Sequence, residues 1–358
     1  MFSPVRLSIA RKRRQMTKKS LAEHAGISQV TLTRIETGQT VEPEEDTISL
    51  IAKTLRYPKK FFYLDDCEEL TPKSVSFRSL SSLTARQRDA ALASGALAHM
   101  LDDWVTQRFH VPELNLLDLR DETPTTAAAA LRRHWGLGYK PIPNIIRLLE
   151  SKGIRVFSLS ESNQNVDAFS TWRNGVPYVF LNTFKSAERS RFDAAHELGH
   201  LVMHMHGEQS GREVEREADQ FASALLVPRE DLIAHLPRIR SLEQLISRKE
   251  RWGISVSALT RAVFDAGLVS EWHYRDLCKE MSYRGYRKNE PLPKERDHSI
   301  LWKKILETLW SERITKEHIA DDLGLPHDEV ESLVGGILPS NVFSTRKLND
   351  NHSHLRAV

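Results

Sequence analysis

The sequence predicts a mainly α-helical, multi-domain protein that contains one small β-sheet. Helix signals dominate the chain, where N-cap residues such as Thr17 and Ser28 open apolar segments of helical period. Strand signals are confined to the segments 154–159, 168–173 and 176–181. We therefore expect an all-α beginning, an α+β middle and a small helical unit towards the end.

The first predicted domain covers residues 1–62, within which residues 4–60 are predicted to form four or five short helices. Gly26 makes a turn, and Ser28 caps the helix that follows it. Ala22 supplies a small side chain where two helices cross, and Leu32 packs the second helix down. This spacing predicts a helix-turn-helix.

Outward-facing side chains after Ser28 are of the types that read base edges in the DNA major groove. Gln29 can bond adenine, Val30 can contact a thymine methyl group, and Arg34 can reach guanine or phosphate. Residues 1–41 hold eight basic and two acidic side chains, a net charge of +6 that leaves −3 for the remainder, which suggests a polyanionic partner. The expected DNA contacts are Lys18, Lys19, Ser28, Gln29, Val30, Thr33 and Arg34, with Arg11 as a further phosphate contact.

The run Gly-Ile-Ser-Gln-Val-Thr-Leu-Thr-Arg-Ile-Glu-Thr-Gly, residues 26–38, resembles the helix-turn-helix of Cro/C1-type (XRE) repressors. The resemblance implies a double-stranded DNA operator as partner. It also implies a homodimer, because such modules usually read palindromes. The alternative is that the basic face binds a protein.

Turn signals organise the middle of the chain. Asn174-Gly175 predicts a tight hairpin between the second and third strands. Pro177 argues against a central position for its strand, so we expect an edge strand that could hold an extended peptide by strand addition. The other expected elements are an acidic linker over 63–75 and helices over 82–109, 123–135 and 143–153.

The segment His196-Glu197-Leu198-Gly199-His200 has the spacing of a metal site on a helix. Two histidines four residues apart project from one helix face, where neutral imidazoles are good zinc ligands. Glu197 between them can reach a metal-bound water as a general base. The other interpretation of the bare motif is a helix whose histidines lie at the edge of a core.

A second helix, expected over 212–226, can supply a third ligand from its acidic first part and leave the fourth position to water. Glu215 is the preferred ligand. Asp219, four residues later, can accept the spare N–H of a ligand histidine. Glu217, expected to face solvent, is the second candidate for the third ligand.

Two nearby histidines are weaker candidates for the site. His206 is the last candidate for the third ligand, because Met203 stands where the extended zinc motif requires a glycine. His204 is expected behind the ligands or on the substrate side.

The segments Arg-Phe-Asp-Ala-Ala-His-Glu-Leu-Gly-His-Leu-Val-Met-His and Glu-Arg-Glu-Ala-Asp-Gln-Phe-Ala-Ser-Ala-Leu-Leu-Val-Pro resemble the ImmA/IrrE family of zinc metallopeptidases. The resemblance implies a zincin-like α+β domain, Zn²⁺ held by His196, His200 and an acid of the second segment, and Glu197 as the base. It leaves activity open, because members of this family are often regulators.

Residues 299–337 are expected to form a small helical unit in which Ala320 and Gly324 repeat the helix-turn-helix spacing, and its acidic second helix favours protein docking. The domains expected along the chain are a helix-turn-helix domain over 1–62, a linker and helical bridge over 63–120, the metallopeptidase domain over 121–280, a basic linker and C-terminal helical unit over 281–340, and a disordered tail over 341–358.

Composition favours a cytoplasmic protein. No apolar stretch is long enough to cross a membrane, and the first residues lack the apolar region of a signal peptide. Cys67 and Cys278 are far apart and match no zinc spacing, so we expect free thiols.

These observations predict a DNA-binding regulator with a zinc-dependent endopeptidase domain that cleaves a regulatory protein. One alternative is a transcription factor whose zinc domain is a sensor or scaffold without turnover. Another is an antitoxin-like or phage-related repressor.

Overall fold

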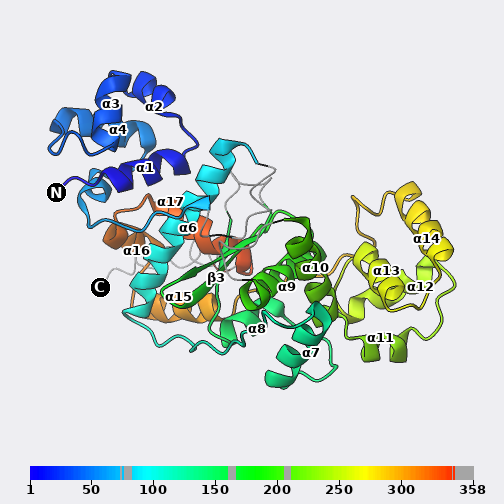
Figure 1. Cartoon of the computed structure of the whole chain (residues 1–358). Coiled ribbons are helices and arrows are strands. Elements are labelled where there is room, and N and C mark those ends of the chain that lie inside the picture. Colours follow the sequence, from blue (N-terminus) through cyan, green and yellow to red (C-terminus); the bar gives the residue numbers. More distant parts are fainter. Residues whose placement is uncertain (73–74, 76–82, 160–166, 205–210, 341, 343–358) are drawn as a thin grey trace, which may run out of the picture.

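A computed structural model describes residues 1–72, 75, 83–159, 167–204, 211–340 and 342 (Figure 1). Helices account for most of this part of the chain, and one three-stranded sheet lies among them. The predicted mainly α architecture with a small sheet is confirmed. The expected tail over 341–358 falls outside the described residues, apart from Val342.

The helix-turn-helix spacing gives the expected packing at the N-terminus. Gly26 ends one helix with a φ of 68°, and the Ser28 side chain caps the next by accepting from the Thr31 amide. Ala22 and Leu32 are buried between the helices. The module consists of α1 (Pro4–Arg13), α2 (Lys18–Ala25), α3 (Gln29–Glu36), α4 (Glu45–Leu55) and the 3-10 helix η1 (Lys59–Tyr63).

The sheet has the order β1-β3-β2, in which β3 runs parallel to β1 and antiparallel to β2. The expectation that β3 is an edge strand is therefore wrong. Pro177 is tolerated because it precedes Tyr178, the first β3 residue paired with β1, so its missing N–H removes no bond from that ladder. The strands are β1 (Arg155–Ser158), β2 (Phe169–Arg173) and β3 (Val176–Leu181).

Two helices cover opposite faces of the sheet. On one face, the Tyr178 hydroxyl of β3 donates to Asp102 of α6 (Ala85–Thr106) at 2.7 Å. On the other face, the Ser170 hydroxyl of β2 donates to Glu197 of α9 (Ala187–Met203) at 2.7 Å. Side chains alternate across a strand, so β2 and β3 contact both helices.

The remaining helices pack around this core, with α13 and α14 at the end of the molecule away from the N-terminal module (Figure 1). They are α7 (Pro124–His134), α8 (Ile145–Ser151), α10 (Arg212–Leu226), α11 (Arg229–His235), α12 (Leu242–Arg248), η4 (Lys249–Arg251), α13 (Val256–Asp265), α14 (Glu271–Tyr283), α15 (Leu301–Ser311), α16 (Lys316–Leu323), α17 (His327–Val334) and η5 (Gly335–Ile337).

Helix α17 of the C-terminal unit contacts both the N-terminal module and the sheet. Glu329 of α17 is buried and accepts from Arg13 of α1 at 2.8 Å. The carbonyl of Ser332, on the same helix, accepts from the Ser158 hydroxyl of β1 at 3.1 Å. The acidic helix for which the sequence favours protein docking thus contacts a basic helix of its own chain.

Candidate metal centre and DNA-contact face

Two packed helices bring the expected metal ligands together. His196 and His200 lie one turn apart on α9, and Glu215 lies in the first turn of α10. The two Nε2 atoms are 3.0 Å apart, and carboxylate oxygens of Glu215 lie 3.3 Å from the first and 3.7 Å from the second. Tetrahedral ligands of zinc lie roughly 3.3 Å from one another, given metal–ligand bonds of about 2.0–2.1 Å. The donor set therefore fits a metal ion.

Each of these histidines has a partner at its second ring nitrogen. His196 Nδ1 lies 2.9 Å from Asp219 Oδ1, and His200 Nδ1 lies 3.1 Å from His204 Nδ1. Such contacts fix the orientation of a ligand ring and its tautomer. Burial lowers the pKa of His196, but hydrogen bonds to Asp219 and Glu215 outweigh this and raise it to about 10. A cation at Nε2 has to replace a proton there.

Glu217 was expected to face solvent, but its carboxylate contacts a histidine next to the site. Its Oε2 lies 3.1 Å from Nε2 of His204. The helix period correctly places Glu217 on a different side of α10 from Glu215. However, α9 ends at Met203, and the backbone of His204 is extended. The imidazole of His204 therefore lies on the side of α10 that carries Glu217. His206, the last candidate ligand, lies outside the described residues.

Glu197 is held beside the ligand cluster from the sheet. Glu197 is 2 % exposed, and its carboxylate accepts from the hydroxyl of Ser170, which is completely buried on β2. The hydrogen bond restricts the rotation of the carboxylate group. Sequence reasoning missed Ser170, because no local pattern relates a strand residue to a helix residue 27 positions later.

Gly199 determines how closely the two helices approach. A β-carbon at this position would lie 3.0 Å from Cδ1 of Phe221 and 3.4 Å from Cα of Ala218, both on α10. Since α10 carries Glu215, the small residue between the two histidines allows the carboxylate of Glu215, the third donor, to reach them.

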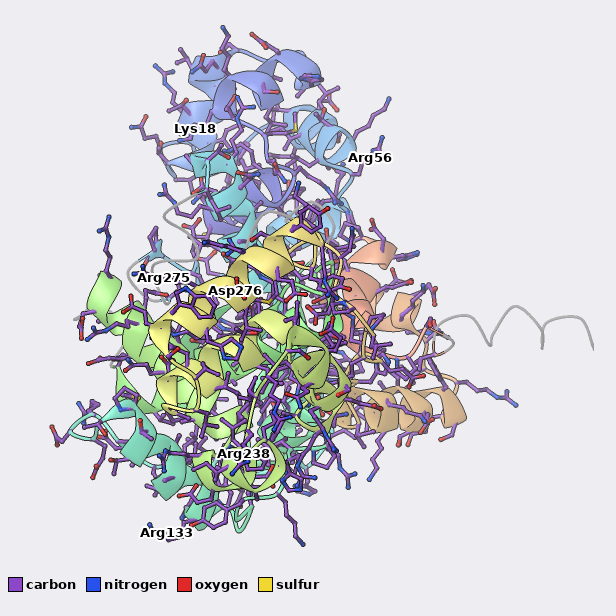
Figure 2. All side chains as sticks on the ribbon, turned by 90° about the vertical axis from the view of Figure 1, so that its right-hand side faces the viewer. Lys18, Arg56, Arg133, Arg238, Arg275 and Asp276 are labelled. Carbon is purple, nitrogen blue, oxygen red and sulfur yellow. The ribbon has the colours of Figure 1, made fainter. Side chains whose placement is uncertain are left out.

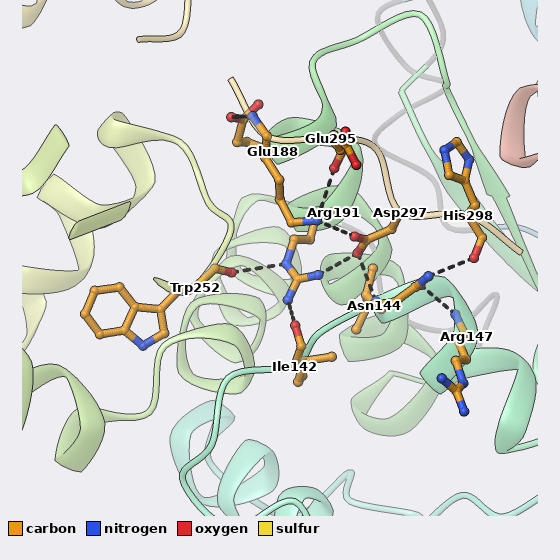
Figure 3. Close-up of polar contacts among 11 residues, drawn as sticks. Ile142, Asn144, Arg147, Glu188, Arg191, Trp252, Glu295, Asp297 and His298 are labelled. Carbon is orange, nitrogen blue, oxygen red and sulfur yellow. Dashed lines mark hydrogen bonds and ion pairs between the residues drawn. The ribbon is translucent and has the colours of Figure 1, made fainter. Parts of the chain in front are cut away.

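Arg191 anchors the first half of α9 to three other segments (Figure 3). Its guanidinium is buried, bonds Asp297 at 2.5 Å and donates to the backbone carbonyls of Trp252 and Ile142. Asp297 also accepts from the Ile145 amide at 2.9 Å. Part of the segment expected as a basic linker thus packs against the helix that carries the histidines.

The DNA-contact residues expected on α3 lie on an open face of the N-terminal module. Gln29, Val30 and Arg34 are exposed, and Thr33 is half-buried. The hydroxyl of Ser28 caps the helix, and both Ser28 and Gln29 at its amino end are exposed. In Figure 1, α2 and α3 lie on the side of the module away from the sheet.

Lysines flank this face. Lys18 is half-buried with Nζ 3.8 Å from Glu36, and the Lys19 side chain is 72 % exposed. Figure 2 places Lys18 at one end of the molecule, far from Arg133 and Arg238.

Several arginines of the basic N-terminus form ion pairs within the protein and are not available to contact DNA. The expectation that Arg11 contacts phosphate is wrong, because its guanidinium is buried and bonds both carboxylate oxygens of Glu36 at 2.6 and 2.9 Å. Arg13 and Arg14 bond Glu329. Net charge in the sequence therefore overstates the positive charge available to a nucleic acid.

Comparison with known families separates the chain into two matched regions. Residues 7–62 match the family model described as helix-turn-helix, and residues 149–264 match the model of peptidase family M78, described as the IrrE N-terminal-like domain. The chain joins an XRE-type helix-turn-helix to an IrrE/ImmA-like domain. This is the fusion that the sequence motifs indicate. No match was found among the curated proteins.

The two matches place both motif sets in the expected context. The IrrE/ImmA-like region contains the histidine pair, Glu215 and the whole sheet, and a metallopeptidase family suggests a metal cofactor. The helix-turn-helix region contains every expected DNA contact. The protein is thus a regulator of DNA-binding type that carries a peptidase-family domain. Among the described helices, none is long and apolar enough to cross a membrane.

Proposed function

We propose that this protein binds an operator through α3 and that His196, His200 and Glu215 hold a zinc ion at which a peptide bond of a regulatory protein is hydrolysed. The observation that carries the proposal is the convergence of three donor groups next to a buried, hydrogen-bonded Glu197. Two histidines and a glutamate are a donor set of hydrolytic zinc enzymes.

The residues around the donors have separable tasks. Asp219 and His204 orient the ligand rings through their second nitrogens. Bound zinc would lower the pKa of a water and polarise the peptide carbonyl. Glu197 takes the proton of the attacking water and passes it to the amide nitrogen that leaves. Ser170 keeps the Glu197 carboxylate in one orientation during both transfers.

Binding to DNA rests on the exposed side chains of α3. Gln29 and Arg34 are of the types that make bidentate contacts to bases, while Lys18 and Lys19 supply phosphate contacts. Recognition of a palindrome would require two copies of the chain, so we propose a homodimer on the operator.

A comparison of wild type with Glu197→Gln and His196→Ala tests the function. We expect about one zinc per chain in wild type and in Glu197→Gln, and less in His196→Ala, by metal analysis. Partner repressors from the same cell should be cleaved by wild type only. A wild-type protein without metal after expression and reconstitution with zinc would contradict the proposal.

The second candidate, a zinc-dependent sensor without turnover, is favoured by one observation. The outer side of β2, beside Glu197, already pairs with Val75 of the same chain. If operator regulation survives Glu197→Gln but not His196→Ala, the site senses rather than cuts.

A further inference from the structure

The chain itself contacts the sheet edge that lies nearest the candidate metal centre. β2 is an edge strand, and its Ser170 hydroxyl touches Glu197. An extended peptide that adds to this edge would run directly past the centre. Thr171, the middle residue of β2, forms an antiparallel bridge with Val75.

The contact of Val75 is supported by burial. Val75 is 3 % exposed and Thr171 is completely buried. Residues paired across antiparallel strands have neighbouring side chains on one face. Tyr178 is the partner of Thr171 on β3 and contacts α6, so Val75 lies towards the α6 face. An aliphatic side chain fits this buried position.

Further residues of the same segment hold it along the edge. Glu68 contacts Nε of Arg173, the last residue of β2, at 3.1 Å. Leu70 is buried against α6, where a β-carbon on Gly95 would overlap its Cδ1 atom. The described residues Glu68 and Val75 thus contact β2 at two points, and Leu70 packs against α6 beside the sheet.

The other end of this segment is fastened to the DNA-binding module. Glu69 bonds Lys12 of α1 at 2.5 Å and accepts from the Ser8 hydroxyl at 3.1 Å. Arg6 of α1 donates to the carbonyl of Asp65 at 2.7 Å. Asp65 and Glu69 therefore contact the module, while Glu68 and Val75 contact β2.

We propose that Val75, together with Glu68 at the end of the strand, is the resident occupant of the peptide-binding edge, so that a second peptide adds to β2 only when Val75 leaves. The edge takes an extended chain with an aliphatic residue opposite Thr171 and a carboxylate within reach of Arg173. This inference rests on the proposed peptidase function, because it names what occupies and regulates that site.

The test uses the full-length protein with Glu197→Gln, loaded with zinc, so that turnover does not consume the probe. The probe is a fluorescent, valine-containing peptide ending in a hydroxamate, which binds zinc. Val75→Asp places a charge in a buried apolar position and should release the segment. Val75→Ile, which keeps the branched aliphatic shape, is its control.

Glu68→Ala and Glu69→Ala form a second pair, because the two glutamates are adjacent but only Glu68 contacts β2. If the edge is filled nine times in ten, release raises the apparent affinity about tenfold. We expect a gain approaching this value for Val75→Asp, a two- to threefold gain for Glu68→Ala and no change for Val75→Ile or Glu69→Ala.

Amide hydrogen exchange of residues 169–173 distinguishes failure of this inference from failure of the proposed peptidase function. We expect faster exchange in Val75→Asp than in Val75→Ile, whether or not zinc is bound. With zinc bound, equal probe affinity in Val75→Asp and wild type overturns the inference. If no variant binds zinc, the peptidase proposal fails, and unchanged exchange in Val75→Asp then overturns the inference by itself.

Discussion

Arg13 of the DNA-binding module and Glu329 of the C-terminal unit form an ion pair that is almost completely withdrawn from solvent. Nη2 lies 2.8 Å from Oε2, and the side chains are 4 % and 1 % exposed. Ser332, beside Glu329 on α17, accepts a further hydrogen bond from Arg13 at 3.0 Å. Because α17 also contacts β1, this pair joins the module to the peptidase-family domain.

Glu329→Gln should destabilise this junction. Removal of one partner of a buried pair leaves the other charge uncompensated, which costs about 3–5 kcal/mol. Denaturant unfolding of the full chain measures the loss. Glu23→Gln is the control, because the Lys19–Glu23 pair is exposed and 3.9 Å apart, and it should change stability by less than about 1 kcal/mol. Equal effects in both variants would show that the Arg13–Glu329 pair does not stabilise the junction.

Ser170→Ala should slow peptide hydrolysis without removing the metal. Loss of a hydrogen bond to a charged group costs about 1.5–3 kcal/mol, which corresponds to a roughly tenfold or larger fall in kcat. KM and zinc content should stay unchanged, because Ser170 contacts Glu197 rather than the ligands. Ser170→Thr keeps the hydroxyl and should restore much of the rate. A rise in KM with unchanged kcat would contradict a role in orienting Glu197.

The sequence was sufficient for the features that a helix period determines. Four-residue spacing places His196 beside His200 and Glu215 beside Asp219, whatever the rest of the fold does. The helix-turn-helix could be predicted for the same reason, since its helix caps and one glycine are close together in the sequence. Neither feature depends on residues from distant parts of the chain.

Features that depend on distant partners could not be predicted. Ser170 faces Glu197 only because the sheet packs on α9, and Pro177 is tolerated in the central strand because the pairing with β1 begins at the next residue, Tyr178. Whether a basic side chain is free to contact DNA also depends on partners that are distant in the sequence. Arg11 was expected to contact phosphate but bonds Glu36, and Arg13, which adds to the basic charge of the N-terminus, bonds Glu329.

Gly199→Ala should separate the two helices of the metal centre. The added methyl group would press on the Phe221 ring at 3.0 Å, and such overpacking costs about 1–3 kcal/mol. Because α10 carries Glu215, zinc affinity should fall together with stability. Phe221→Leu removes the opposing ring atoms, so the double variant should recover part of both losses in a double-mutant cycle. Additive losses would show that the two residues do not oppose each other.

His99 of α6 should make the fold sensitive to acid. It is 2 % exposed beside Tyr178, and neither ring nitrogen has a hydrogen-bond partner among the described residues. Burial, with a smaller effect of the Arg173 charge, lowers its pKa from 6.5 to about 3. The unfolded chain thus binds the proton more readily, so the stabilisation is complete above pH 6.5 and is lost as the pH falls towards 3.

The size of this effect follows from the two pKa values. At pH 5 the loss attributable to His99 is about 2 kcal/mol. Urea unfolding at pH 7.5 and pH 5 measures it, with His99→Leu as the comparison, since leucine fills the site without an ionisable group. We expect wild type to lose more stability than His99→Leu between these pH values, and His99→Leu to be at least as stable at pH 7.5, because it buries no unpaired nitrogen. The same loss in both proteins would assign the acid sensitivity to other groups.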